Sequence, residues 1–179
     1  MSQSKEEQMY NAACRGDLEK VKSLSSDPAV NINWQREGGY TPFYVASKAG
    51  HVGVVKYLLS LNGIDPNIPN NEGASPFLKA CSKGLKEVVS LLLADPRIDP
   101  NKPENDQTTP LWYASQNGHL PVVQHLFASE KNIDTKIRST FNNKTAAEHA
   151  RAMRTKIKED HETEEELQRR KTYSPSAPT

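Results

Sequence analysis

The chain has 179 residues, 35% of them hydrophobic, which is enough for one ordinary domain or a short array of repeats. Its 23 Lys and Arg residues balance 22 Asp and Glu residues, so a net charge of +1 gives no bulk attraction to nucleic acid or an anionic membrane. No apolar run reaches the roughly eighteen residues of a spanning helix, and the polar start lacks a signal-peptide segment. We therefore expect a soluble cytoplasmic protein, with entry into the nucleus as an alternative.

The first predicted element is a flexible N-terminus over residues 1–6, followed from Glu7 by a degenerate helix pair, "EQMYNAACRGDLEKVKSLSS". Later copies of this pattern have aliphatic residues where this one has Lys20 and Ser25. Leu18, Val21 and Leu24 then form a single inward stripe. The polar outer face that results is what a terminal repeat needs.

Three full copies follow at intervals of 34 residues, and they start at Thr41, Ser75 and Thr109. Each opens with Thr-Pro or Ser-Pro, which predicts a helix N-cap with proline in the first turn. A short helix should end at a glycine, where a positive φ carries no steric penalty, and a second helix should follow with aliphatic residues at helical spacing. The three glycines are Gly50, Gly84 and Gly118.

A last degenerate copy starts at Thr145 and lacks the glycine and the second-helix aliphatic residues. We expect it to run on as a charged helix that docks through Ala150, Met153 and Ile157. The predicted repeat domain covers residues 7–157, with repeats starting near 7, 41, 75, 109 and 145. Residues 158–179 are predicted to be a charged helical extension that ends in a disordered Pro/Ser-rich tail.

Polar turns rich in Pro, Asn, Asp and Gly separate the copies. One helix pair of this size cannot bury its apolar face alone, so the copies must stack into a continuous core. The predicted fold class is all-α: an elongated solenoid of helix-turn-helix units.

The repeated pattern resembles the ankyrin repeat. In the third full copy the pattern is Thr-Pro-Leu, the small residues Ala114 and Ser115, then Asn117-Gly118-His119 and two valines. The resemblance covers roughly Glu7 to Arg154, and it implies β-hairpin-like finger loops and a concave surface made by fingers and first helices. The chain departs from the family where a histidine usually follows Thr-Pro-Leu, which leaves open the inter-repeat hydrogen bond of that histidine. The residues at this position are Tyr44, Leu78 and Trp112.

No pattern of residues predicts catalysis or a metal. His51 and His119 share one position of the repeat, which favours a structural role over that of a catalytic base. Cys14 and Cys81 lack metal-like spacing and are expected to be free thiols, and no phosphate-binding loop or nucleophile motif is present. We therefore expect no enzymatic activity, catalytic residue, cofactor or metal.

One modification is implied by the resemblance alone. Ankyrin repeats can be hydroxylated on the asparagine of the turn between repeats, and Asn67 and Asn101 lie at that position. The competing interpretation is that these side chains only brace the turn through hydrogen bonds to the backbone.

A recognition surface remains when the framework positions are subtracted. Lys48, Lys79 and Lys83 are predicted to form a basic track along the first helices, with tyrosines as rigid anchors. The full set predicted to contact a partner is Arg36, Tyr40, Val45, Lys48, Asn71, Glu72, Lys79, Ser82, Lys83, Asn105, Asp106, Trp112, Tyr113, Gln116 and Asn117. For Trp112, which replaces the framework histidine, packing within the scaffold is the alternative. Replacing both Tyr113 and Lys79 is expected to weaken binding without changing the melting profile.

These features predict a monomeric adaptor or scaffold that binds a protein or peptide of acidic and apolar character along its concave face. The alternatives are a nucleic-acid-binding protein and a regulatory or inhibitory ankyrin protein. Acidic residues in the fingers would oppose the approach of phosphates, which disfavours nucleic acid. No small-molecule substrate and no membrane contact are expected.

Overall fold

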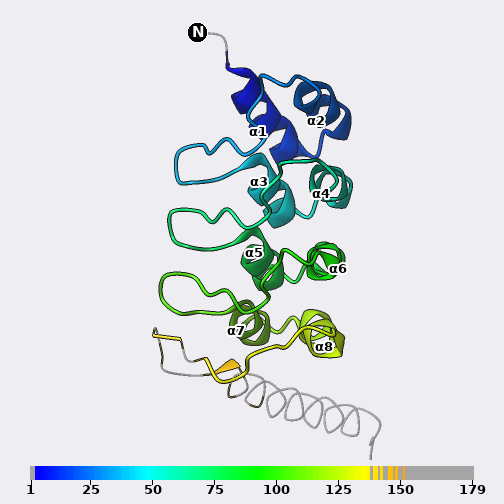
Figure 1. Cartoon of the computed structure of the whole chain (residues 1–179). Coiled ribbons are helices and arrows are strands. Elements are labelled where there is room, and N and C mark those ends of the chain that lie inside the picture. Colours follow the sequence, from blue (N-terminus) through cyan, green and yellow to red (C-terminus); the bar gives the residue numbers. More distant parts are fainter. Residues whose placement is uncertain are drawn as a thin grey trace, which may run out of the picture.

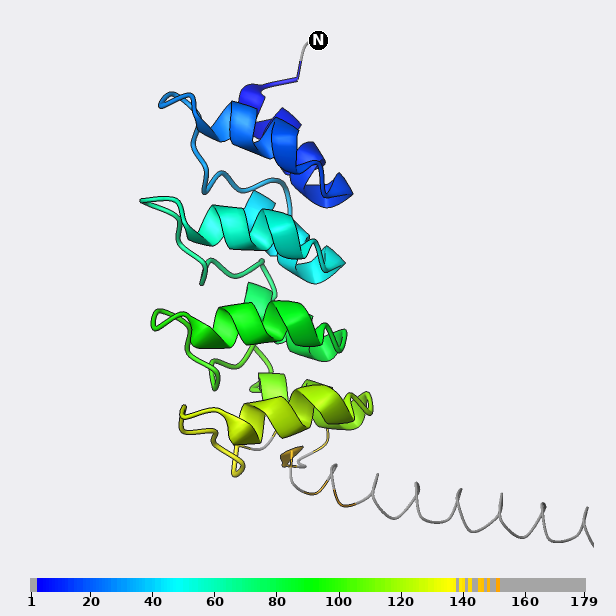
Figure 2. The same ribbon diagram turned by 90° about the vertical axis from the view of Figure 1, so that its right-hand side faces the viewer.

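The computed structural model describes residues 3–137, 139, 140, 142, 145, 146, 148 and 151. Four helix pairs stack into an elongated array, and loops project to one side between successive pairs (Figure 1). The first helices are α1 Lys5–Arg15, α3 Pro42–Ala49, α5 Pro76–Ser82 and α7 Pro110–Gln116. The second helices are α2 Leu18–Ser25, α4 Val52–Leu59, α6 Lys86–Ala94 and α8 Leu120–Ala128, and they lie one above another in Figure 2. This arrangement confirms the predicted all-α solenoid.

The helices begin where the repeated Thr/Ser-Pro pairs predict. The hydroxyl of Thr41 accepts a hydrogen bond from the backbone N–H of Tyr44 at 3.0 Å, and Ser75 and Thr109 make the equivalent bond in the next two repeats. A proline occupies the first turn each time, where its missing N–H is not needed. Gly50 then ends α3 with φ at 82°, a conformation that costs an L side chain energy.

The N-terminal boundary of the predicted repeat domain is two residues too late. Ser4 accepts a hydrogen bond from the backbone N–H of Glu7 at 3.1 Å and caps α1. Lys5 and Glu6 therefore belong to the first helix and not to a flexible N-terminus. The sequence pattern did not predict this cap, because Ser4 is followed by lysine and not by the proline that follows the cap residue in the three full copies.

The core lies between the two columns of helices and runs the length of the array. The first helices contact one another in series, as do the second helices. Phe43, Phe77, Leu58 and Leu92 are among the largest side chains that are completely buried. Stacking therefore buries what a single helix pair would expose.

Three loops between the helix pairs, here called fingers, comprise residues 33–40, 67–74 and 101–108. Each finger is joined to the next by one backbone hydrogen bond: Asn71 N–H donates to Gly38 at 3.0 Å, and Asn105 N–H donates to Glu72 at 3.1 Å. Gly73 allows this close approach, because a Cβ there would stand 2.3 Å from Oδ1 of Asn105. The fingers thus form one continuous ribbon along the side of the array.

At the C-terminal end, the described residues include the start of the predicted last copy. Thr145 and Glu148 cap each other: the Glu148 N–H donates to the Thr145 hydroxyl at 3.2 Å, and the Thr145 N–H donates to the Glu148 carboxylate at 2.6 Å. This reciprocal pair is a capping box, which marks a helix start. The predicted docking residues Ala150, Met153 and Ile157 and the predicted extension over 158–179 lie outside the described residues. Within the described part of the chain, no helix is long and apolar enough to cross a membrane.

Candidate functional site: a pocket on the concave face

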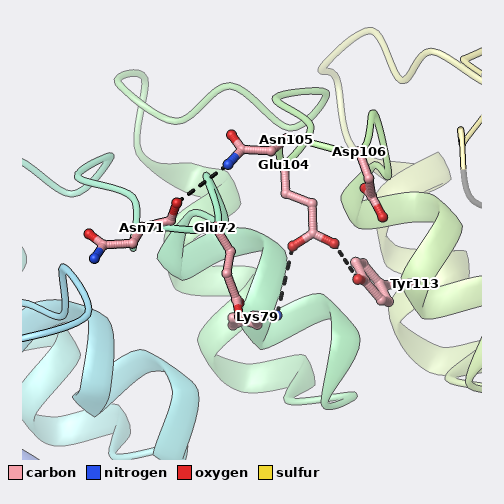
Figure 3. Close-up of a pocket in the computed structure, with 7 residues that line it drawn as sticks. All are labelled: Asn71, Glu72, Lys79, Glu104, Asn105, Asp106 and Tyr113. Atoms are coloured by element: carbon pink, nitrogen blue, oxygen red, sulfur yellow. Dashed lines mark hydrogen bonds and ion pairs between the residues drawn. The ribbon is translucent and has the colours of Figure 1, made fainter.

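A pocket opens on the concave face between the last two fingers and their first helices (Figure 3). It has a volume of about 510 Å³. Six of its seven lining residues belong to the set predicted from the sequence to contact a partner, and the seventh is Glu104. The lining residues are Asn71, Glu72, Lys79, Glu104, Asn105, Asp106 and Tyr113.

Glu104 is the central residue of the pocket. It stands in the third finger with 8% of its surface exposed. The hydroxyl of Tyr113, on α7, donates a hydrogen bond to one carboxylate oxygen, and the other oxygen lies 3.9 Å from Nζ of Lys79, on α5 (Figure 3). Lys79 also lies 5.6 Å from the centre of the Tyr113 ring, within reach of a cation–π contact. One carboxylate therefore holds side chains from two successive first helices.

Burial decides the ionisation of this cluster. The pKa of Glu104 is raised because burial disfavours the charged carboxylate, although the Tyr113 hydrogen bond and the Lys79 charge both oppose the shift. The pKa of the Tyr113 phenol is also raised, first by burial and then by its hydrogen bond to Glu104. Tyr113 is thus fixed as a hydrogen-bond donor.

The N-terminal half of the concave face carries cations over aromatic rings. Arg36 lies 5.2 Å from the centre of the Tyr10 ring, and Nζ of Lys48 lies 5.5 Å from the centre of the Tyr40 ring. Arg36 occupies in the first finger the position that Glu104 occupies in the third, two periods of 34 residues later. The same structural position is therefore basic at one end of the array and acidic at the other.

Two of the predicted contact residues belong to the core. Trp112 is 3% exposed and Val45 is 8% exposed, so neither can contact a partner on the surface of this structure. Trp112, Tyr44 and Leu78 occupy the position where the family usually has a histidine. Tyr44 and Leu78 are completely buried. The large side chains at this position serve packing in the core, so the packing alternative holds for Trp112, and the contact predicted for Val45 is wrong.

The other predicted residues outside the pocket remain at the surface, but not all of them are free. Asn117 donates from Nδ2 to the backbone carbonyl of Ser82 at 2.8 Å, which ties α7 to α5. Arg36, Lys48, Lys83 and Gln116 are exposed, and Tyr40 is half-buried beneath Lys48. The predicted basic track is therefore interrupted, because its middle member, Lys79, is paired with Glu104.

Sequence reasoning places Glu104 among the variable finger residues but does not predict its burial or its contacts with Tyr113 and Lys79. The finger position that is Arg36 and Asn70 in the first two fingers becomes a carboxylate in the third. Tyr113 lies nine residues further on, and it replaces Val45 and Lys79 of the earlier copies. Both positions differ in every copy, so the sequence shows that they vary but not that Glu104 and Tyr113 contact each other.

The asparagine near the start of each finger donates to the turn that follows the second helix of the next repeat. Asn67 donates from Nδ2 to the carbonyl of Arg97 at 2.9 Å, and Asn101 donates to the carbonyl of Asn132 at 2.7 Å. Asn33, which sequence reasoning left out, makes the same kind of bond to Gly63 at 2.7 Å. These bonds account for the asparagines as braces, and hydroxylation of Asn67 and Asn101 stays a prediction.

The residues considered for chemistry take part in packing between repeats. The Nε2 atoms of His51 and His119 lie 3.0 Å and 2.9 Å from the backbone carbonyls of Cys14 and Ser82 in the preceding repeats. Cys81 is completely buried, and burial raises the pKa of its thiol, which disfavours the nucleophilic thiolate. Among the described residues, no group of three or more His, Cys, Asp or Glu side chains is arranged to hold a metal ion.

Comparison with known proteins agrees with this architecture. A family model described as ankyrin repeats, in three copies, matches residues 9–104 and 61–139, which together span more than half of the chain. A search of the curated proteins found no match. On the family match and the stacked helix pairs, the chain belongs to the ankyrin-repeat family.

Proposed function

We propose that this protein is a non-enzymatic adaptor or scaffold that binds another protein along its concave face. Ankyrin repeats generally mediate protein–protein interaction. The observation that carries the proposal is the pocket around Glu104, because residues that vary among the copies come together there on a rigid framework. The rigid array presents this surface with little ordering cost on binding.

The charges of the pocket favour a basic side chain of the partner. Glu72, Glu104 and Asp106 bring three carboxylates to the pocket, and Lys79 brings one ammonium group. The ring of Tyr113 adds a surface that attracts cations. At the pocket we therefore propose a basic group of the partner instead of the acidic one expected from the sequence. The reason is that Lys79 is paired with Glu104 and offers less positive charge to a partner.

The whole concave face favours one direction of a bound segment. Arg36 and Lys48 are exposed near the first two repeats, where Glu37 is the exposed carboxylate of the finger, and three carboxylates gather at the pocket near the last two. A partner segment with an acidic residue at one end and a basic residue at the other complements this surface in only one orientation. Carboxylates along the path would repel nucleic-acid phosphates, which supports a protein partner over the alternative of nucleic acid. We place this interaction in the cytoplasm, which localisation of the tagged protein would test.

A charge reversal in the pocket tests the proposal. Glu72→Lys changes an exposed carboxylate of the pocket, and Glu87→Lys makes the same change at an exposed position on α6, in the column of second helices. Partners purified with the wild-type protein should be lost with Glu72→Lys and retained with Glu87→Lys. For a partner so identified, the dissociation constant should rise at least tenfold, about 1.4 kcal/mol. Equal binding by all three proteins would place the interface elsewhere.

The structure also changes the design suggested by the sequence. Replacing Tyr113 and Lys79 together removes both groups that pair with buried Glu104. An unpaired buried carboxylate destabilises the fold, so that double variant would alter the melting profile as well as binding. Glu72 is exposed, and its replacement separates the two effects.

A further inference from the structure

Two cations at the N-terminal end of the concave face are positioned by aromatic rings. Cζ of Arg36, in the first finger, lies 5.2 Å from the centre of the Tyr10 ring on α1. Nζ of Lys48, on α3, lies 5.5 Å from the centre of the Tyr40 ring. These cation–π contacts hold both charges where α1, the first finger and α3 lie next to one another (Figure 1).

Both cations are exposed, and within the described residues neither is paired with a carboxylate. The ion pairs found there use other cations, namely Lys5, Lys22, Lys79 and Arg97. Glu37 is the exposed carboxylate of the same finger, and it too belongs to none of these pairs. Two positioned charges are therefore available to an anion from outside the chain.

Arg15 brings a third cation to the same place. It is exposed in the last turn of α1. Partial burial raises the pKa of the neighbouring Cys14 thiol, and three positive charges oppose this shift, those of Arg36, Arg15 and Lys48. Near the surface such an effect acts only over a short distance, so the three cations surround one point. We call Arg15, Arg36 and Lys48 the cation patch.

We propose that the cation patch binds a phosphorylated side chain of the partner protein. A phosphate monoester carries a charge of about −1.5 to −2 at pH 7 and three acceptor oxygens, so it can pair with several cations at once. A carboxylate carries a single charge and two oxygens, which leaves part of the patch unpaired. This inference rests on the proposed function, because it identifies the acidic group at one end of the bound segment.

The rest of the concave face favours a protein over a nucleic acid as the source of the phosphate. The carboxylates of Glu72 and Asp106 line the pocket near the last two repeats. A nucleic acid carries a phosphate on every nucleotide and would bring some of them against these carboxylates. A phosphorylated protein segment carries its phosphate at one position and can place a basic residue in the pocket.

The test uses two short peptides that differ only in the anion. One has phosphoserine flanked by alanines, the other has glutamate in its place, and both carry an uncharged fluorophore. The fluorescence anisotropy of the phosphoserine peptide should rise to saturation on titration with the full-length protein at physiological salt. The glutamate peptide should bind more weakly by roughly tenfold, because it offers less charge and fewer oxygens to the patch.

Single substitutions locate the site of binding. Arg36→Gln and Lys48→Gln should each weaken binding of the phosphoserine peptide by roughly fivefold, since each removes one cation that pairs with the phosphate. Lys56→Gln is the matched control, because it removes the same charge from an exposed position on α4, in the column of second helices. Circular dichroism melting verifies that the three variants remain folded.

Four results would overturn the proposal. Without saturable binding of the phosphoserine peptide, the patch holds no phosphate, and equal binding of both peptides would make the ligand a carboxylate. An equal loss with Lys56→Gln would reduce the attraction to net charge. Displacement of the bound peptide by a single-stranded oligonucleotide at a lower concentration than by unlabelled peptide would assign the patch to nucleic acid. The titration needs no natural partner, so its failure is distinct from a failure of the Glu72→Lys test of the pocket.

Discussion

At the scale of single residues, Glu104 links the pH of the solution to the stability of the array. Burial raises the pKa of Glu104 in the folded state. Between the pKa of Glu104 in the unfolded chain and its pKa in the folded protein, the folded protein therefore keeps a proton that the unfolded chain releases. The free energy of unfolding contributed by this group is greatest below the pKa of the unfolded chain, and it falls as the pH rises through the folded pKa. Glu104→Gln should remove this fall, because the amide never ionises and can still accept the Tyr113 hydrogen bond.

Urea unfolding of the wild type and the variant between pH 4 and pH 7 measures the effect. The advantage of Glu104→Gln over the wild type should grow as the pH rises. Glu72→Gln is the control, since Glu72 lines the same pocket but is exposed. Stability curves for Glu104→Gln and the wild type that run parallel across this range would show that burial does not control Glu104.

The sequence predicts framework residues better than it predicts their exceptions. Framework residues recur at a fixed interval, as Thr41, Ser75 and Thr109 do. Each is a Thr or Ser because its hydroxyl caps the helix that follows it, so the local sequence is enough to predict it. Trp112 and Glu104 depend on neighbours in other elements. Their burial depends on how closely the fingers and the first helices of neighbouring repeats pack, and the local sequence does not predict the distance between these elements. The sequence therefore predicts the caps, but it leaves Trp112 open between packing and contact and does not show that Glu104 is buried.

At the scale of elements, polar clamps between repeats add to the packing of helices. Arg97, after α6, binds both carboxylate oxygens of Asp95 and donates to the backbone carbonyls of Ile64 and Leu59, at 3.0 Å and 3.3 Å, in the preceding repeat. Lys131 occupies the equivalent position one repeat later and donates to the carbonyls of Asp95 and Ile98. The equivalent residue of the earlier repeat is Gly63, so the repeated pattern could not predict the clamp.

Removal of the Arg97 clamp should destabilise the array measurably. Arg97→Ala leaves the carbonyls of Leu59 and Ile64 without this donor and leaves Asp95 with only the backbone N–H of residue 97, and the side chain of Arg97 is 41% exposed. Solvent can replace part of these bonds, so we expect a loss of about 1–2 kcal/mol in the free energy of unfolding by urea. Lys86→Ala, an exposed position on α6, should change it by less than about 0.5 kcal/mol. A loss for Arg97→Ala no larger than that of Lys86→Ala would contradict this role for the clamp.

At the scale of the whole molecule, contacts between neighbouring repeats carry both stability and the binding surface. Each helix pair packs on the pair before and after it, and the fingers are bonded in the same order. An array of this kind gains stability from each repeat and from each interface between neighbours. The concave pocket spans two fingers and two first helices, so it exists only while the interface between α5 and α7 is formed.

The centre of the second-helix column is where this coupling is most easily broken. Leu92 is completely buried in α6, which packs on α4, α5 and α8. Leu92→Ala removes apolar contacts and leaves a cavity, which should cost about 2–5 kcal/mol. The weakened centre should then let the N-terminal and C-terminal halves unfold separately. The two tryptophans report on the two halves, because Trp34 lies in the first finger and Trp112 lies in α7.

Fluorescence of single-tryptophan backgrounds, Trp34→Phe and Trp112→Phe, should therefore give coincident urea transitions with Leu92 intact and separate transitions with Leu92→Ala. Glu87→Ala, at an exposed position on the same helix, should keep the transitions coincident. A single cooperative transition for Leu92→Ala, shifted by less than about 1 kcal/mol, would mean that the first helices alone couple the two halves. The second helices would then contribute burial without transmitting stability along the array.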